Sequence, residues 1–515
     1  MKTVTDRKII CPYCFKEFEH DQVHFRLETV KNDGYYLSDI EHESDLQKKE
    51  EMQQSMYFQP KDDKDYTRFW SGYGATTELT TNNEKTRFGC EVYQLPIIDP
   101  SSSEAGRCLR LQDHGNGQSD YFLYDGYGMV QGVEDIYGAT SHRRVCPNCH
   151  NPLPNGYGKN TTKFISVIGV TGSGKTVYIS QLLKNMAYYS HYLVNMSTHT
   201  KDDRVENFVN NNLVKRNVPL PDPTMAGRLA QPMTYDIVKS NGEHETIVIY
   251  DIAGENCKNA TEMERYGDFV MHSHGIILLI SPKQMGFIED YGDRKADDDN
   301  TEDAAPPKAV LDTIYNAIVE KNQGLCEIPL AVCISKSDFF AHSLGEGEEN
   351  GAEIVEIATN DVVPFEDPVT GIKKPGFNAT QYNVIQKKIT KMMERNPIAG
   401  DLQREYKYYN YFIFSAVGCA VKKEEKNGKI VSYPVDDPNP IRIAEPLLWL
   451  FKRFGYIKAD THIRLPNLRG DPNKKIHINL TKSQKIANFF SPGKYPGVRG
   501  YTPEEIEALW YEETL

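Results

Sequence analysis

The sequence predicts an α/β protein in which a small cysteine-bearing module precedes a larger domain of alternating strands and helices. Three observations predict this fold class. An apolar strand, a glycine-rich turn and an amphipathic helix follow one another between residues 162 and 186. Other apolar runs of strand length end in short polar motifs farther along the chain. Two C-P-x-C pairs, Cys11/Cys14 and Cys146/Cys149, lie before this region.

The glycine-rich turn has the spacing G-x-x-x-x-G-K-T, and its flanks are those of a phosphate-binding loop. The apolar run Phe164–Ile168 predicts a strand before the turn, and apolar residues at helical spacing predict a helix after it. Glycines let backbone N–H groups surround a polyphosphate, and the new helix adds its positive end. Lys175 is expected to reach the β- and γ-phosphates, and the Thr176 hydroxyl to bind Mg²⁺. The residues expected to bind a nucleotide here are Gly169, Thr171, Gly172, Ser173, Gly174, Lys175, Thr176 and Val177.

Length and composition limit the class of protein. A chain of 515 residues exceeds one ordinary core, so two or three domains are expected. The net charge of −13 argues against a broad surface for nucleic acid or anionic membrane. No apolar run reaches the ~18 residues of a membrane span, and the N-terminus lacks the apolar region of a signal peptide. Six scattered cysteines, besides the two pairs, suit a reducing compartment, so we expect a cytoplasmic protein.

The two C-P-x-C pairs resemble the two halves of a zinc ribbon, in which four thiolates bind one tetrahedral metal. Roughly 130 residues separate Cys14 from Cys146, whereas a compact ribbon has about 15–20 between its pairs. We therefore expect a Zn²⁺ site that is split by a large insert. A redox dithiol is the alternative, but the polar sequence after Cys14 does not suggest the amphipathic helix of such a domain. His150 could replace a thiolate, but four cysteines suffice, so it is expected to be a surface residue.

The expected domain boundaries follow these motifs. They are a first zinc knuckle at 1–20, an inserted α+β or mainly β region at 21–140, a second knuckle and linker at 141–160, the phosphate-loop domain at 161–456, and a tail with a terminal helix at 457–515. Within the insert, Phe69, Trp70 and Tyr73 are expected to form a small core rather than a binding surface.

A second motif lies at the end of a predicted hairpin. The runs Met233–Val238 and Thr246–Tyr250 are joined by K-S-N-G-E-H-E, in which N-G is a hairpin signal. The second run continues into D-I-A-G, from Asp251 to Gly254. A carboxylate at the exposed end of a buried strand suits Mg²⁺, and the backbone N–H of Gly254 could meet a γ-phosphate.

Two further strand-like runs, 329–334 and 410–414, end in motifs that suit a purine base. The first ends in S-K-S-D, which resembles N-K-x-D with Ser335 in place of asparagine. The Asp338 carboxylate can accept hydrogen bonds from the guanine N1–H and 2-amino groups, and the Lys336 stem can lie along the base plane. The second ends in Ser415-Ala416-Val417-Gly418, which resembles the S-A-x loop whose backbone completes a guanine pocket; Ser415 and Ala416 are the expected binding residues.

Together these four motifs resemble the translation-factor-related class of P-loop GTPases, the group that includes Ras-like proteins. The resemblance covers about 162–456 and implies a mostly parallel sheet with one antiparallel strand, GTP and Mg²⁺ as cofactors, and insertions at 286–307, 339–405 and 421–438. With its zinc ribbon, the chain is similar to prokaryotic double-GTPase-type proteins, for which a role in bacterial conflict or antiviral defence is often implied.

Some positions depart from the pattern that the resemblance implies. Glu255 stands where many Ras-like enzymes have a water-orienting glutamine, and Thr171 stands where the phosphate loop often has glycine. Both departures imply slow or altered hydrolysis. The switch threonine that would complete Mg²⁺ coordination is best matched by Thr224, with Thr234 as the second choice. The expected catalytic residues are Lys175, Thr176, Thr224, Asp251 and Glu255.

The sequence thus predicts a Mg²⁺-dependent GTPase that acts as a switch on an unidentified protein partner, with no membrane contact. Two alternatives stay open. A nucleotide-bound scaffold would bind GTP without hydrolysing it. A zinc-ribbon reader of nucleic acid would use Arg143, Arg144 and Lys159, although the acidic net charge opposes this reading.

Overall fold

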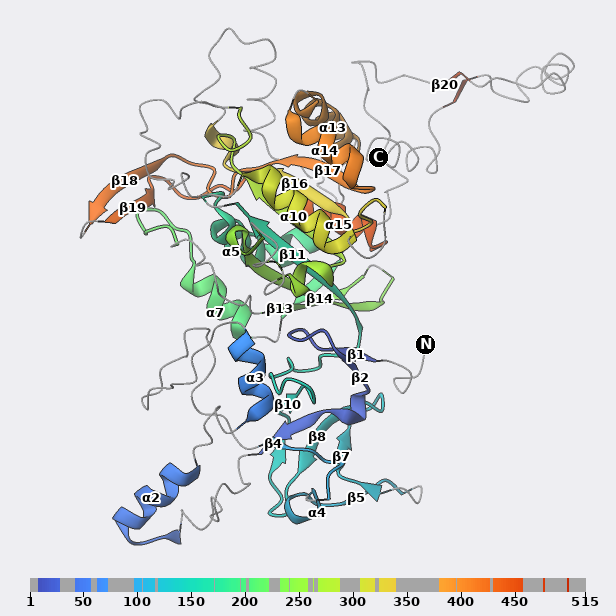
Figure 1. Ribbon diagram of the computed structural model, residues 1–515, viewed down its shortest axis with the longest axis vertical. Coiled ribbons are helices and arrows are strands. Elements are labelled where there is room, and N and C mark those ends of the chain that lie inside the picture. Colours follow the sequence, from blue (N-terminus) through green and yellow to red (C-terminus); the bar gives the residue numbers. More distant parts are fainter. Residues whose placement is uncertain are drawn as a thin grey trace, which may run out of the picture.

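The structure is a computed structural model of the chain, and it describes residues 8–27, 42–56, 63–72, 97–103, 105–115, 119–170, 172–194, 196–200, 203–221, 232–239, 241–257, 263, 267–287, 306–319, 324–339, 379–394, 396–426, 429–456, 476–477 and 498–499. Figure 1 shows an N-terminal module, drawn blue to cyan, below an α/β domain drawn green to orange. Among these residues, no helix is both long and apolar enough to cross a lipid bilayer.

The N-terminal module consists of short elements. They are β1 (Ile9–Ile10), β2 (Glu17–Phe18), η2 (His20–Gln22), β3 (His24–Arg26), α2 (Leu46–Met56), α3 (Lys64–Gly72), β4 (Ile97–Ile98), α4 (Ala105–Cys108), β5 (Gln112–Asp113), β6 (Ser119–Asp120), β7 (Phe122–Tyr124), β8 (Val130–Glu134), β9 (Thr140–Ser141) and β10 (Arg144–Val145). The strands form the sheets β1-β2, β10-β3-β4, β5-β6 and β7-β8-β9. Because β3 pairs with β10, the start of the expected insert is joined to the strand that leads directly into the second cysteine pair.

The α/β domain contains the longer elements. They are β11 (Thr161–Gly169), α5 (Lys175–Lys184), α6 (Met186–Val194), β12 (Ser197–His199), α7 (Asp203–Asn211), β13 (Met233–Val238), β14 (His244–Ala253), η4 (Gly254–Cys257), α9 (Asp268–Met271), β15 (Gly275–Ile280), α10 (Pro307–Val319), β16 (Leu330–Ile334), η5 (Ser337–Phe339), α13 (Ala379–Met393), α14 (Pro397–Glu405), β17 (Tyr409–Ile413), β18 (Val421–Lys426), β19 (Lys429–Pro434) and α15 (Glu445–Arg453). Two short strands, β20 (Ile476–His477) and β21 (Val498–Arg499), pair with each other nearer the C-terminus.

The central sheet has the strand order β12-β13-β14-β11-β15-β16-β17. Strand β13 is antiparallel to both of its neighbours, and the remaining pairs are parallel. The prediction of a mostly parallel sheet with one antiparallel strand is therefore confirmed. The predicted hairpin between β13 and β14 is also present, and its Gly242 has φ 80°, a left-handed conformation that glycine adopts without strain.

Alternate residues of each central strand face opposite sides of the sheet. On β11, Ile165 and Val167 pack with apolar residues of α5 and α15, whereas Phe164 and Ile168 pack with those of α9, α10, α13 and α14. This second face also contacts apolar residues of the N-terminal module, such as Phe15. The module and the sheet domain consequently share one continuous core.

The insertions that the resemblance implied are described in part. Residues 421–426 and 429–434 form the β18–β19 hairpin, which projects at the left of Figure 1. Helices α13 and α14 occupy the last part of 339–405. The acidic stretch 288–305 and the predicted terminal helix lie outside the described residues.

Candidate functional site

The phosphate loop joins β11 to α5 at the carboxyl end of the sheet. Gly172 and Gly174 both have φ 77°, which a side chain would strain. The N–H of Ser173 donates to the carbonyl oxygen of Val170 at 2.9 Å, and this bond closes the turn. Helix α5 begins at Lys175, so its first N–H groups point toward the loop. The sequence therefore folds as the expected strand, loop and helix, while Thr171 lies outside the described residues.

Lys175 and Asp251 meet at the centre of this site. Strands β11 and β14 are parallel neighbours, and Asp251 lies opposite Val167 in their register. The Lys175 Nζ atom forms an ion pair with Asp251 Oδ1. The Lys175 side chain is 6% exposed and the Asp251 side chain 12% exposed. The expected phosphate ligand and the expected Mg²⁺ ligand thus neutralise each other in this conformation.

Gly254 brings the D-x-x-G turn against the phosphate loop. A Cβ atom on Gly254 would lie 2.5 Å from the carbonyl oxygen of Gly169 and 3.1 Å from the Cα atom of Val170. Only glycine permits this approach of the two backbones. The turn continues into η4, which contains the backbone of Glu255; the Glu255 side chain lies outside the description.

Of the two candidate switch threonines, the structure describes Thr234 and not Thr224. Thr224 lies outside the described residues, so its role stays a prediction. Thr234 is the second residue of β13, where it is 7% exposed. The structure therefore places Thr234 within the sheet rather than in a loop.

The two motifs that the sequence predicts to recognise a base are adjacent at the ends of β16 and β17. The Ser415 hydroxyl donates to Asp338 Oδ1 at 2.6 Å, and the Ser337 N–H donates to the carbonyl oxygen of Phe414 at 3.0 Å. Lys336 has φ 53°, and its Cε atom lies 3.8 Å from the position that a Cβ atom on Gly174 would take. The Lys336 stem thus reaches the phosphate loop from the base motif.

Ser335 stands where the N-K-x-D motif has asparagine, and its smaller side chain makes a different contact. The hydroxyl of Ser335, which is 1% exposed, donates to the carbonyl oxygen of Ile280 at 3.2 Å. Ser335 is therefore bonded to the neighbouring strand β15, where an asparagine side chain would extend farther. Ala416, next to Ser415, is half-buried.

Gly418 supports the second of these motifs, although it is not among the predicted binding residues. It has φ 63°, its N–H donates to the Ser415 hydroxyl at 2.9 Å, and a Cβ atom on it would collide with the carbonyl oxygen of Asn439. It therefore orients the hydroxyl that holds Asp338. The glycine that closes S-A-V-G was the available signal in the sequence.

The four paired cysteines form one cluster. The sulfur atoms of Cys11, Cys14, Cys146 and Cys149 all lie within 4.8 Å of one another. Cys11 Sγ is 3.7 Å from Cys149 Sγ, and Cys14 Sγ is 3.8 Å from Cys146 Sγ. A tetrahedral Zn²⁺ with Zn–S bonds of about 2.3 Å requires sulfur–sulfur separations of about 3.8 Å. The two shortest contacts match this separation, and the four sulfur atoms together form a donor set that suits such an ion.

The two cysteine turns have the same backbone geometry. In the first, Cys11 N–H donates to the Lys16 carbonyl, Phe15 N–H donates to the Cys11 carbonyl, and Tyr13 N–H donates to Cys11 Sγ at 3.4 Å. The second turn repeats all three bonds, from Cys146 to Asn151, from His150 to Cys146, and from Asn148 to Cys146 Sγ at 3.4 Å. The residue after each pair is left-handed, with φ 54° at Phe15 and 53° at His150. N–H groups directed at sulfur stabilise thiolates, as a metal ligand requires.

The pKa values of the four thiols are strongly perturbed by one another. Burial raises the pKa of Cys11 and of Cys149 well above the ordinary value. Hydrogen bonds from neighbouring thiols, that of Cys11 above all, lower the pKa of Cys14 and of Cys146. A divalent cation would offset the cost of burying charge and hold all four groups as thiolates.

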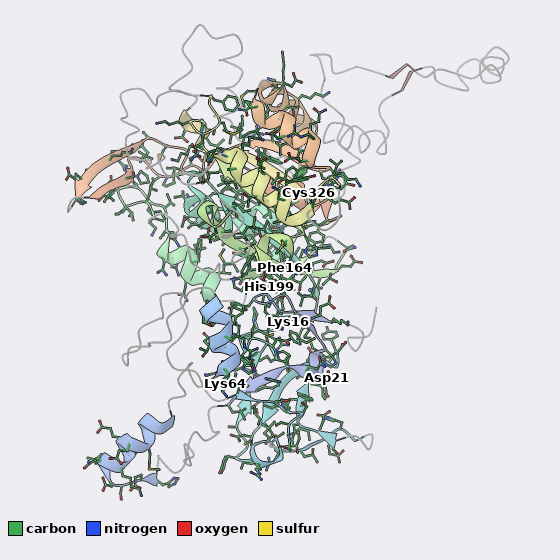
Figure 2. All side chains as sticks on the ribbon, viewed as in Figure 1. Lys16, Asp21, Lys64, Phe164, His199 and Cys326 are labelled. Atoms are coloured by element: carbon green, nitrogen blue, oxygen red, sulfur yellow. The ribbon has the colours of Figure 1, made fainter. Side chains whose placement is uncertain are left out.

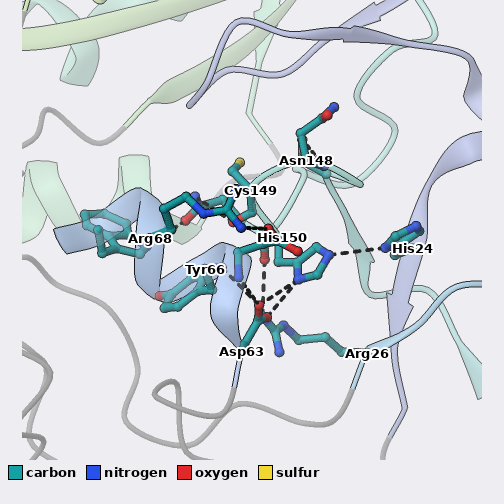
Figure 3. A network of polar contacts seen from close by, with 12 residues as sticks. His24, Arg26, Asp63, Tyr66, Arg68, Asn148, Cys149 and His150 are labelled. Atoms are coloured by element: carbon teal, nitrogen blue, oxygen red, sulfur yellow. Dashed lines mark hydrogen bonds and ion pairs between the residues drawn. The ribbon is translucent and has the colours of Figure 1, made fainter. Parts of the chain in front are cut away.

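A polar network joins the second cysteine turn to helix α3. His150 Nδ1 lies 2.8 Å from Asp63 Oδ1, His24 Nδ1 lies 3.3 Å from His150 Nε2, and Arg26 donates to the His150 carbonyl at 3.2 Å (Figure 3). The hydrogen bond with His150 lowers the pKa of Asp63 against the opposing effect of burial. With a side chain only 13% exposed, His150 is not the surface residue that the sequence predicted. Sequence spacing could not reveal Asp63 as its partner, because Asp63 lies in the insert.

The N-terminal module also contains Trp70, which was expected in its core, and Arg144 and Lys159, which were candidates for nucleic-acid contact. Trp70 is 5% exposed, and its indole N–H donates to Asn151 Oδ1 at 3.0 Å, so it belongs to the core as predicted. Arg144 is 4% exposed and donates to the carbonyl oxygens of Pro154 and Tyr157, and Lys159 pairs with Asp125. Arg144 is therefore a structural residue rather than a contact for nucleic acid.

Comparison with known proteins places the phosphate loop in a wider group. A family model described as the P-loop containing dynein motor region matches residues 159–229. A Mycolicibacterium smegmatis protein with the provisional name ESX-1 scaffolding and assembly protein SaeC is 24% identical over 153 residues. That match covers 28% of this chain and 40% of the relative, so the chain spans well under half of that protein's length. Taken with the loop geometry, the family match shows that the chain carries a P-loop NTPase domain.

Proposed function

We propose that this protein is a Mg²⁺-dependent GTP-binding switch whose nucleotide domain is joined to a zinc ribbon. The contact between the two base motifs carries the proposal. The Ser415 hydroxyl holds Asp338 at 2.6 Å, and Lys336 extends from the same motif to the phosphate loop. A carboxylate fixed in this way offers two acceptor oxygens to neighbouring N–H donors, which guanine presents and adenine does not.

The order of the strands supports a nucleotide site at this edge of the sheet. β11 lies between β14 and β15, and the chain order reverses there. In open α/β sheets, ligands bind outside the carboxyl ends of the strands at such a reversal. The phosphate loop, the D-x-x-G turn and both base motifs all leave the sheet at this end, after β11, β14, β16 and β17.

Each residue then has a role in the proposed site. Lys175 would bind the β- and γ-phosphates, while Thr176 and Asp251 would hold Mg²⁺. Gly254 would sense the γ-phosphate through its backbone N–H, because this residue packs closely against the start of the phosphate loop. Loss of the γ-phosphate would release this turn, and that change is the output of a switch. Thr224 and Glu255 are the remaining candidates for the hydrolysis step.

Competition titration tests the nucleotide assignment. GTP should displace a fluorescent guanine nucleotide at least tenfold better than ATP, and Asp338→Asn should remove most of this preference, because an unpaired buried polar group costs about 1–3 kcal/mol. Equal affinities for GTP and ATP in the wild type would refute the base assignment. Lys175→Ala should abolish hydrolysis, and unchanged turnover in that variant would refute the phosphate-loop assignment.

A nucleotide-bound scaffold is the second candidate. The M. smegmatis relative is named for scaffolding and assembly, which favours a protein-binding role for this chain as well. Glu255, in place of a water-orienting glutamine, is consistent with lost hydrolysis. Single-turnover release of phosphate separates the two candidates. A scaffold would bind GTP and release no phosphate, whereas a switch would release one phosphate per site.

The cysteine cluster is proposed as a structural Zn²⁺ site, because its four sulfur atoms lie within 4.8 Å of one another on two matched turns. Metal analysis of the purified chain should return about one zinc per molecule, and Cys146→Ser should lower this value. Metal-free protein that undergoes reversible dithiol oxidation would support a redox site instead. Binding to RNA or DNA that weakens with salt would revive the nucleic-acid reading.

A further inference from the structure

The first cysteine turn is inserted into the nucleotide domain through one aromatic side chain. Phe15, directly after Cys14, is 7% exposed. Its ring makes edge contacts with Phe164 of β11 at 5.4 Å and Phe269 of α9 at 5.2 Å, and it stacks on His272 at 4.5 Å. Figure 2 shows Phe164 where the blue module meets the sheet domain. Such aromatic contacts stabilise beyond simple burial.

A buried hydrogen bond adds a second connection at the same place. The Tyr250 hydroxyl donates to the carbonyl oxygen of Pro12 at 2.8 Å. Pro12 lies between Cys11 and Cys14, so the acceptor belongs to the cysteine turn itself. The Tyr250 ring also contacts Phe15 at 6.0 Å. Tyr250 is 0% exposed, so the loss of this bond would leave a buried hydroxyl without its acceptor.

Both contacts involve strands that run directly into the proposed nucleotide site. Tyr250 directly precedes Asp251 on β14, and the strand runs on into the D-x-x-G turn. Phe164 lies on β11, which ends at the phosphate loop. On the face of the sheet opposite α5, the first cysteine turn thus contacts both of these strands, at Phe164 and at Tyr250.

The first cysteine turn has little structure of its own to hold this position. It is flanked by β1 and β2, which contribute two residues each. A two-stranded pair of this length is not stable alone in water. The second cysteine pair comes from a distant part of the chain, so a shared metal would join the two turns and fix the first one.

We propose that metal binding at the four cysteines is thermodynamically coupled to nucleotide binding, with Phe15 and Tyr250 as the coupling residues. This inference rests on the proposed nucleotide and zinc sites. Zinc holds the first turn in place, the turn supports β14 and α9 through these two residues, and the supported strand presents Asp251 and Gly254. Coupling of this kind is reciprocal, so nucleotide binding must also raise the affinity of the four cysteines for zinc by the same factor.

The test measures GTP affinity in zinc-loaded protein and in protein stripped by a chelator. Zinc removal should weaken GTP binding in the wild type by about 5-fold or more. Phe15→Ala retains all four cysteines but should bind GTP nearly equally with and without zinc. Phe69→Ala is the matched control, because Phe69 contacts Tyr13 of the same turn from α3 and not from the nucleotide domain. It should keep the wild-type coupling. Tyr250→Phe, which removes one hydroxyl only, should reduce the coupling if Phe15→Ala fails to fold.

Equilibrium competition for zinc with a chromogenic chelator provides the reciprocal measurement, and GTP should raise the zinc affinity of the wild type and of Phe69→Ala by the same factor. Equal GTP affinity in loaded and stripped wild-type protein would overturn the proposal. If neither form binds guanine nucleotide, the proposed function fails, and hydrogen exchange of residues 244–257 then decides whether zinc binding stabilises β14 and the turn after it through Phe15. Zinc-dependent protection that Phe15→Ala removes would support it, and exchange that is unaffected by zinc would overturn it.

Discussion

Replacing Asp251 by asparagine should make the nucleotide site bind better without metal. In the structure, the Asp251 carboxylate forms an ion pair with Lys175, the residue proposed to bind the phosphates. A metal-free nucleotide must break this ion pair and then remain close to the Asp251 carboxylate. Mg²⁺ removes both costs, because it binds the carboxylate and the phosphates together. Asp251→Asn removes the carboxylate charge and leaves Lys175 ready for the phosphates.

The size of the effect follows from the burial of the pair. The two side chains are 6% and 12% exposed, so the ion pair is shielded from solvent. Removing one partner of a buried pair typically costs 3–5 kcal/mol. An asparagine oxygen can still accept a hydrogen bond, so we take the lower end, about 3 kcal/mol. This cost falls on the nucleotide-free state of Asp251→Asn, and phosphate binding recovers it, which corresponds to about 100-fold in affinity.

Titration with GTP in EDTA and in Mg²⁺ measures the change in affinity. Urea unfolding of the nucleotide-free protein measures the change in stability. We expect Asp251→Asn to unfold more easily than wild type, to bind GTP more tightly in EDTA, and to gain little from Mg²⁺. Asp236→Asn is the matched control, since Asp236 lies on β13 of the same sheet and bonds Thr246 away from the phosphate loop. Weaker or equal GTP binding by Asp251→Asn in EDTA would refute the reasoning.

Two further predictions concern the same strands. Gly254→Ala places a methyl group 2.5 Å from the Gly169 carbonyl, so the phosphate loop must shift, and GTP affinity measured by calorimetry should fall at least tenfold; unchanged affinity would show that the two turns do not touch. Burial lowers the pKa of His274, which accepts a hydrogen bond from the Phe164 N–H, to about 4. Because the unfolded chain takes up this proton near pH 6.5, stability from neutral His274 is present above that pH and is lost as the pH falls toward 4. Between pH 7 and pH 5 the wild type should lose about 2 kcal/mol of unfolding free energy that His274→Gln does not lose, as measured by urea denaturation at both pH values.

Much of the sheet domain could be predicted from local sequence. The runs 164–168, 233–238 and 275–281 end in glycine, polar or charged residues, and all three are strands in the structure. The pattern is plainest in β15, where every residue from Gly275 to Ile280 is buried and the side chains on both faces are apolar.

The N-terminal module could not be predicted to the same extent. Its strands are two to five residues long, and such strands carry little periodicity. His150 illustrates the reason. Its environment depends on Asp63 and His24, which are remote in sequence and meet it only when the cysteine turns are brought together. Sequence patterns have a short range, so they could suggest by spacing that the four cysteines act together, but not which groups surround them.

Phe15 shows how these two kinds of information combine. Its position after Cys14 fixes it in a turn, because the repeated C-P-x-C geometry gives the following residue a left-handed backbone. That backbone costs a non-glycine residue roughly 1–2 kcal/mol, so the position must be stabilised by contacts elsewhere. In the second turn, His150 obtains them from Asp63 within the module. In the first turn, Phe15 obtains them from β11, β14 and α9 of the NTPase domain. The same local motif is thus anchored once inside its own module and once in the nucleotide domain, which is why the cysteine cluster and the phosphate loop form one structural unit.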